Sequence, residues 1–150
     1  MNVQDSLHQI EGLPCHNFKL VAGGSLILYI GTVEPPSSIT EWRLHIDSAW
    51  RLDGVEEPLL GSFDTLACER PRAPVTERCL SFLRSLVGRK ILAVAYAPPA
   101  GDLTLEFDGG STLRTFAHTI EGDIWELRHR NGQRYGFCDG TYREWLEDAD

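Results

Sequence analysis

The sequence predicts an α+β fold: a mostly antiparallel sheet built from two similar β-units, with one main helix, over residues 75–87, packed on it. Two observations predict this fold. A strand–turn–strand pattern in the first third of the chain returns near its end, and between the two copies lies a segment with apolar residues at helical spacing. The whole chain, 1–150, has the length of one domain. We therefore expect a single domain with an internal duplication of the β-unit, at about 12–52 and 88–138.

The two copies match position by position. The first begins at Gly12 and the second at Gly88, and each reads as turn, strand, Gly-rich turn and strand. The matching apolar positions are Leu26, Leu28 and Ile30 in the first copy and Leu103, Leu105 and Phe107 in the second. A Trp-x-Leu sequence follows each hairpin, at Trp50 and at Trp125. This correspondence predicts that the two hairpins superpose.

The strands of the first unit have different surroundings. Residues 15–21 and 26–30 form the predicted hairpin, and residues 26–30 are apolar on both faces. A strand of that kind is normally covered on both sides, so we expect a helix or another chain over it. The next predicted strand, residues 42–46, alternates and places Arg43 and His45 on its polar side.

Helices are predicted before the first hairpin and before the second. Residues 3–11 form a short helical lead-in, and residues 53–74 form an irregular connection with a short strand near 59–63. The main helix follows Pro74 and stops before Gly88, which suit its two ends. Its apolar stripe consists of Val75, Cys79, Phe82, Leu83 and Leu86.

The second unit is predicted to be a series of antiparallel strands. The expected strands are residues 91–97, 103–107, 112–117, 125–129 and 135–138. Asn131-Gly132 between the last two is a strong hairpin signal. The acidic segment 144–150 is expected to end the chain as a short helical turn, with Tyr142 and Trp145 packed inward.

Charge and composition restrict the partners. The formal net charge is −8, which disfavours binding to nucleic acid because that binding requires neutralisation of phosphates by basic residues. The same charge suits a basic protein partner, and it also suits simple solubility. Arginine greatly outnumbers lysine, which indicates a GC-rich, bacterial genome. No secretion signal and no apolar run long enough for a membrane span are visible, so the expected location is cytoplasmic.

No assembled catalytic or metal site is apparent in the sequence. The four cysteines form no C-x-x-C pair, and the five histidines are scattered singly, so we expect no metal and no cofactor. Cys15 and His16 are neighbours, but adjacent strand residues point to opposite faces. We expect Cys15 to be a buried thiol and His16 to be a core or rim residue. The Gly-rich turns run into strands rather than helices, which argues against a nucleotide cradle.

Carboxylates beside large aromatic side chains are the candidate partner-binding groups. They gather near Trp125 and Trp145, and acidic groups next to aromatic anchors suit a basic protein partner. The alternative is that both tryptophans are core residues. The candidate partner-binding residues are Glu121, Asp123, Glu144, Glu147 and Asp148.

A family resemblance supplies a more specific expectation. The segment 101–110, followed by Trp125-Glu126-Leu127 and Asn131-Gly132, resembles a pattern in small bacterial β-rich proteins, some of them similar to immunity proteins of polymorphic toxin systems. The resemblance implies a non-enzymatic, cytosolic protein-binding protein, with an immunity protein that masks a toxin as one form. The alternative is a small-molecule-binding protein or an enzyme with a pocket between the two β-units. The oligomeric state stays open, a homodimer included.

Overall fold

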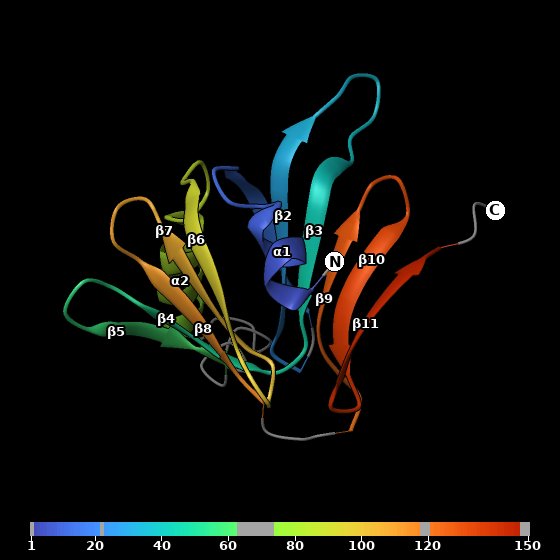
Figure 1. Ribbon diagram of the computed structural model, residues 1–150. Coiled ribbons are helices and arrows are strands. Elements are labelled where there is room, and N and C mark those ends of the chain that lie inside the picture. Colours follow the sequence, from blue (N-terminus) through green and yellow to red (C-terminus); the bar gives the residue numbers. More distant parts are fainter. Residues whose placement is uncertain (1, 22, 63–73, 118–120, 148–150) are drawn as a thin grey trace.

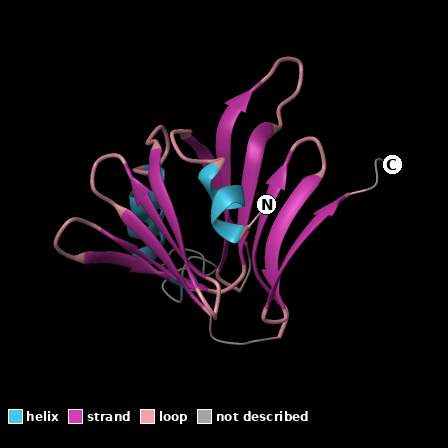
Figure 2. Cartoon of the chain, in the orientation of Figure 1, coloured by secondary structure: helices cyan, strands magenta, loops and turns pink. Residues whose placement is uncertain are grey.

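The fold consists mainly of two antiparallel sheets (Figures 1 and 2). The computed structural model describes residues 2–21, 23–62, 74–117 and 121–147. Within those residues the chain forms two short helices and eleven strands. The prediction of a mostly antiparallel, β-rich protein is therefore confirmed. The α+β description with one main helix is not clearly met, because the longer helix has only 11 residues and strands dominate.

The chain divides its strands between the two sheets in an unexpected order. The six-stranded sheet has the order β1-β2-β3-β9-β10-β11 and contains β1 (Cys15–Val21), β2 (Ser25–Val33), β3 (Thr40–Ile46), β9 (Asp123–His129), β10 (Gln133–Cys138) and β11 (Thr141–Leu146). The five-stranded sheet has the order β5-β4-β8-β7-β6 and contains β4 (Ala49–Asp53), β5 (Pro58–Gly61), β6 (Ile91–Ala97), β7 (Asp102–Phe107) and β8 (Thr112–Phe116). The helices are α1 (Val3–His8) and α2 (Pro74–Arg84).

Each half of the chain contributes to both sheets. The order of α1 and β1–β5 in the first half matches the order of α2 and β6–β10 in the second. However, β4 leaves the strands of its own half and pairs with β8, while β9 pairs with β3. The six-stranded sheet therefore takes three consecutive strands from each half, and the five-stranded sheet takes two from the first half and three from the second. Neither half can complete a sheet alone, so the two halves share one hydrophobic core.

The first hairpins of the two halves meet through reciprocal backbone contacts. The N–H of Gly12 donates to the carbonyl of Ile91 at 2.7 Å, and the N–H of Gly88 donates to the carbonyl of Cys15 at 2.8 Å. Both glycines have positive φ, +83° and +86°, which explains why a glycine opens each copy. The same kind of backbone contact is thus made once by each half of the chain.

A β-bulge occurs at the same place in both hairpins and corrects the prediction for His16. The register shifts between Cys15 and Asn17 in β1, and between Ile91 and Ala93 in β6. The extra residue of each bulge, His16 or Leu92, is exposed. The prediction of a core or rim histidine is wrong because a bulged residue leaves the regular alternation of the strand. Cys15 is buried, as predicted.

Two buried tryptophans tie each crossing strand back to its own half. The indole Nε1 of Trp50 donates to the carbonyl of Gly24, and the indole Nε1 of Trp125 donates to the carbonyl of Gly101, both at 2.8 Å. A buried indole N–H needs such an acceptor. Trp50 lies on β4 and Trp125 lies on β9, the two strands that pair with the other half of the chain. Each indole ring nevertheless bonds to the first hairpin turn of its own half. Trp125 is therefore a core residue.

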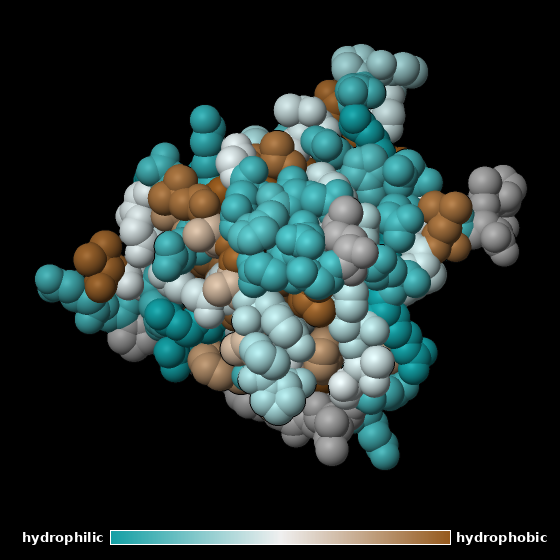
Figure 3. All heavy atoms as spheres, viewed as in Figure 1, coloured by the Kyte–Doolittle hydropathy of each residue, from teal (hydrophilic) through white to brown (hydrophobic). Residues whose placement is uncertain are grey.

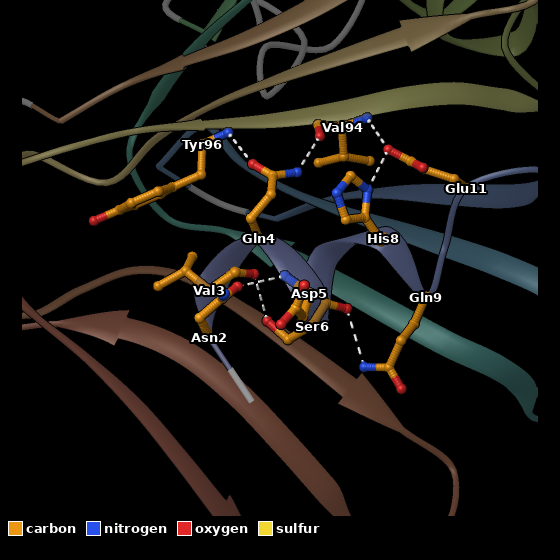
Figure 4. Close-up of polar contacts among 10 residues, drawn as sticks. All are labelled: Asn2, Val3, Gln4, Asp5, Ser6, His8, Gln9, Glu11, Val94 and Tyr96. Atoms are coloured by element: carbon orange, nitrogen blue, oxygen red, sulfur yellow. Dashed lines mark hydrogen bonds and ion pairs between the residues drawn. The ribbon is translucent and has the colours of Figure 1, made fainter.

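Helix α1 closes the outer edge of β6 (Figure 4). The side chain of Gln4 donates to the carbonyl of Val94 at 2.7 Å and accepts from the N–H of Tyr96 at 3.1 Å. The carboxylate of Glu11 accepts from the N–H of Val94 at 3.0 Å. In Figures 1 and 2 the helix lies in the opening between the two sheets. It thereby satisfies backbone groups that an edge strand would otherwise present to other chains.

The main helix is shorter than predicted. Helix α2 ends at Arg84 rather than at residue 87, and a turn continues to Gly88. Leu83 and Leu86 are buried, as the apolar stripe requires, and α2 contacts β1 and β5. The side chains of Val75 and Cys79 lie outside the described residues, as do the rest of the 53–74 connection after Ser62 and any strand beyond Gly61.

The C-terminal segment is a strand where a helical turn was predicted. Residues 141–146 form β11, which pairs with β10. The cause is the turn at Asp139-Gly140, in which both residues have positive φ. An Asp-Gly pair of this kind favours a two-residue hairpin, which continues the sheet. In β11 Tyr142 faces the core, but Trp145 is 36% exposed on the opposite face, so the prediction that both pack inward is wrong for Trp145.

Candidate functional site

The surface offers no broad apolar patch on the face that α1 occupies. In Figure 3 the apolar side chains on this face appear as separate patches in a mainly hydrophilic surface. Scattered apolar residues are normal on a monomeric protein. A candidate site therefore has to be sought among the polar side chains.

A row of five side chains crosses the outer face of the six-stranded sheet. One residue comes from each of five neighbouring strands, and each stands directly opposite the next in the strand register. We call this set the arginine row, and its members in order are Tyr29, Arg43, Arg128, Arg134 and Trp145. Its centre is three arginines side by side, with an aromatic residue at each end.

This arrangement is unfavourable for folding on its own. Like charges directly opposite each other in a sheet destabilise it, by about 0.2–1 kcal/mol per pair. The arginine row contains two such pairs, Arg43 with Arg128 and Arg128 with Arg134. Arg128 and Arg134 share the carboxylate of Glu126, which offsets the repulsion between them, so the unfavourable pair that remains is Arg43 with Arg128.

Two of the three arginines are held in position by a nearly buried carboxylate. Glu126 is 8% exposed although it lies on the outer face of its strand. It forms an ion pair with Arg128, and Nη1 of Arg134 donates to the same oxygen at 3.2 Å. Arg134 also pairs with Glu147, and the hydrogen bond from Arg134 lowers the pKa of that carboxyl. Among the described residues Arg43 has no ion-pair partner.

His45 is a neutral member of the same cluster. Burial first, and then the charges of Arg128, Arg43 and Arg134, lower its pKa to about 4. Its ring is consequently uncharged at neutral pH. Nε2 of His45 and Nε of Arg134 are buried and have no hydrogen-bond partner in the part of the chain that the structure describes. The cluster thus holds a fixed surplus of positive charge and of hydrogen-bond donors.

A glycine makes room for the aromatic residue at one end of the row. Gly136 lies next to Trp145, and a Cβ built on Gly136 would come within 3.1 Å of the indole ring. Any other residue there would therefore push the ring away from the sheet. The Trp145 side chain nevertheless remains 36% exposed. Tyr29, at the other end, is half-buried.

The acidic residues predicted as the binding site do not form one surface. Glu121 and Asp123 are exposed at the start of β9. Glu144 lies on the opposite face of β11 from the arginine row and accepts a hydrogen bond from the Tyr142 hydroxyl at 2.7 Å. Glu147 is on the outer face and pairs with Arg134. Asp148 lies outside the described residues.

The structure shows no reactive group next to the arginine row. Burial raises the pKa of the Cys15 thiol to about 11. A hydrogen bond to Asp123 raises that of Cys138 to about 11 as well, so both are protonated at neutral pH. Within the described residues no three His, Cys, Asp or Glu side chains are grouped as metal ligands. In the part of the chain that the structure describes, no helix is long and apolar enough to cross a membrane.

A shallow concavity lies on the other sheet. It has a volume of about 580 Å³ and lies on the outer face of the five-stranded sheet beside the β4–β5 turn. Arg51, Asp53 and Arg114 form its floor, and Glu56 and Glu57 contribute from the turn. It is thus an open surface of one sheet, not a pocket between the two β-units.

Comparison with known protein families, with curated proteins and with solved structures gives no match. A proposal on function therefore has to be based on the geometry of the chain itself.

Part of the arginine row could have been found from the sequence. The Asn131-Gly132 signal predicts the hairpin of β9 and β10, but a two-residue turn there would place Arg128 opposite Tyr135, and only the observed register places it opposite Arg134. Arg43 was recognised on the polar side of its strand. The pairing of β3 with β9 had no signal in the sequence, because it joins strands from different halves of the chain.

Proposed function

We propose that the protein is a non-enzymatic protein-binding protein that binds its partner through the outer face of the six-stranded sheet. The arginine row carries this proposal: it places three arginines between a tyrosine and a tryptophan at a cost to folding. Arginine, tyrosine and tryptophan are the residue types that most often dominate binding energy at interfaces. A flat sheet face also changes little on binding, which lowers the entropic cost of forming a complex.

The specific form of this function that we propose is that of a bacterial, cytosolic immunity protein that masks a toxin. Masking requires a rigid surface of complementary charge and no catalytic group, and the thiols of Cys15 and Cys138 are protonated at neutral pH. The resemblance of the 101–110 segment to proteins of this kind supports the same choice.

Photo-crosslinking from the two sheets tests which surface binds. A photoreactive phenylalanine derivative replaces Tyr29 in one variant and Glu106, the corresponding position of the five-stranded sheet, in the other. A third variant carries it at Glu121. In the cells that make the protein, we expect the variant with the photoreactive residue at position 29 to form one adduct with another protein. Excess wild-type chain without the photoreactive residue should abolish this adduct. The variant at position 106 should form none. Adducts only from position 121 would favour the acidic surface and a basic partner instead.

The captured protein then tests the immunity role. We expect that producing it alone inhibits growth and that co-production of the wild-type chain restores growth. If the captured protein has no effect on growth, the proposed binding function would stand, but the proposal that the partner is a toxin would be rejected.

The concavity on the five-stranded sheet supports a second candidate, binding of a small molecule. Two guanidinium groups, Arg51 and Arg114, pair with the carboxylate of Asp53 there, and Glu56 and Glu57 also line the concavity. A small anion would bind to the two guanidinium groups. Stabilisation on heating by small carboxylates or phosphates, lost in an Arg114→Gln variant, would favour this candidate; no shift would exclude it.

A further inference from the structure

We propose that the arginine row recognises an acidic segment of a protein partner, laid across the strands so that its carboxylates bind Arg43 and Arg128. This inference rests on the proposed function, because it names the chemistry of the partner for the same face. The net charge of the chain favours a basic partner, whereas this inference names an acidic one.

The local charge of the face supports an acidic partner. The outer face of the six-stranded sheet carries five cationic side chains against four carboxylates, those of Glu41, Asp47, Glu126 and Glu147, while His45 is neutral. The five cations are Lys19, Arg43, Arg128, Arg134 and Arg143. The chain as a whole has a formal charge of −8. This face therefore has one cation more than it has carboxylates, although the chain as a whole is acidic, so it repels an acidic partner less than the average surface of the chain does and orients its approach.

The positions of the guanidinium groups are suited to carboxylates. Arginine binds a carboxylate with two parallel hydrogen bonds, which gives direction as well as energy. Glu126 fixes Arg128 and Arg134, so little side-chain entropy is lost when a ligand binds them. Arg43 has no carboxylate partner among the described residues, and it stands next to this fixed pair. It is the group with the most binding capacity left.

The structure already contains one carboxylate bound to the row. Glu147 follows the end of β11, and its carboxylate pairs with Nη2 of Arg134. The backbone N–H of Glu147 donates to the carbonyl of Gly132 at 2.9 Å, which anchors the residue at the edge of this sheet. A carboxylate on an extended chain can therefore reach the outer face and bind this row. A partner segment would place further carboxylates at Arg128 and Arg43 in the same way.

The length of the row fits a short peptide. Neighbouring strands are about 4.8 Å apart, so five strands separate Tyr29 from Trp145 by about 19 Å. An extended segment rises about 3.3 Å per residue, so about six residues cover that distance. The aromatic rings at the two ends can pack on the apolar parts of such a segment and define its limits.

Nucleic acid is the less favourable occupant. Single strands also bind to sheet faces that combine arginines with aromatic rings. A long polyanion, however, would extend beyond the row and meet the negative charge of the rest of the chain, whereas a segment of six residues would not. The distinction can be tested directly.

The test measures binding of two fluorescent probes, a peptide of about six glutamates, which matches the length of the row, and a single-stranded DNA of about ten nucleotides, which exceeds it. Wild-type protein is compared with Arg43→Gln and with Arg84→Gln, a control on exposed Arg84 of α2. We expect the peptide to bind wild type and the control equally. We expect at least a tenfold loss of affinity for Arg43→Gln, and weaker binding to all three at higher salt.

Three results would overturn the inference: no peptide binding to wild type at low salt, equal peptide binding by wild type and Arg43→Gln, or tighter binding of the DNA than of the peptide. Melting temperatures of the three proteins check that Arg43→Gln is folded. The outcome is separate from that of the crosslinking experiment: adducts from position 29 together with failure of the peptide to bind would leave the proposed function intact and reject only the acidic partner.

Discussion

The outer faces of the two sheets share one register but differ in chemistry. In the six-stranded sheet Tyr29, Arg43 and Arg128 stand opposite one another on β2, β3 and β9. The corresponding positions on β7, β8 and β4 of the five-stranded sheet are Glu106, Thr112 and Asp53. The same scaffold therefore tolerates a row of cations on one sheet and carboxylates on the other. The difference teaches that the arginine row is not a requirement of this fold, which is why we assign it to binding.

The two outer faces also differ in how far their cations are paired with carboxylates. In the five-stranded sheet Asp53 pairs with both Arg51, at 2.8 Å, and Arg114, at 2.5 Å, so the cations there have a partner between them. In the six-stranded sheet Glu126 binds Arg128 and Arg134 but leaves Arg43 without an ion-pair partner among the described residues. One face is close to internally neutralised, and the other keeps charge available.

The largest expected effect concerns the cores of the two halves. Leu7 lies near the end of α1, and Leu83 lies near the end of α2. Both side chains are fully buried. Truncation of either to alanine should lower the free energy of unfolding by about 2–5 kcal/mol, because each leaves a cavity in a packed core. Denaturant unfolding measures both. A cost below about 1 kcal/mol for one of them would break the correspondence between the halves.

A smaller effect is expected for the dependence of stability on pH. It concerns His45, a position at which the two outer faces differ. His45 occupies the place of Arg114 in the other sheet, with Glu126 directly opposite it and the charges of Arg43, Arg128 and Arg134 nearby. Its pKa is about 4 in the folded protein and about 6.5 when unfolded. The unfolded chain therefore binds the proton more tightly, and stability falls as the pH drops from about 6.5 towards 4.

Melting temperatures at several pH values between 7 and 4 test this prediction. We expect the loss of stability on acidification to be smaller in His45→Gln than in wild type. An NMR titration gives an independent check, since the His45 ring should stay neutral at pH 5.5. A ring that is half-protonated near pH 6.5 would show that the arginine charges and the burial do not act on it.

The smallest effect sharpens the comparison of charges. Arg43→Gln should raise the free energy of unfolding by about 0.2–1 kcal/mol, because it removes a like-charge pair with Arg128. Arg114→Gln removes an ion pair with Asp53 as well as a like-charge pair with Arg51, so the two effects offset each other and the free energy of unfolding should change less than in Arg43→Gln. Chemical denaturation of both variants at low salt measures the difference. If both variants were destabilised, the arginine row would be a structural element rather than a binding surface.

The candidate site could be predicted only in part. The Asn131-Gly132 turn predicts the hairpin of β9 and β10 but not the register that places Arg128 opposite Arg134, and the alternation of β3 puts Arg43 on a polar face. The Asp139-Gly140 turn carried a signal for β11 that the acidic composition of residues 144–150 obscured. The predicted acidic surface was not brought together, because two of its members, Glu144 and Glu147, lie on opposite faces of the sheet.

The sequence by itself determined the local structure: the two matching hairpins, their glycines at positive φ, the alternation of inner and outer residues, and the buried stripe that includes Leu83 and Leu86. Turn chemistry and side-chain periodicity act over a few residues, so they can be read from the chain. The exchange of β4 and β9 between the sheets was decided by the tertiary structure alone. That pairing joins strands far apart in the chain through backbone hydrogen bonds, which carry no residue-specific signal. It is also the step that brings Arg43 beside Arg128 and so assembles the site.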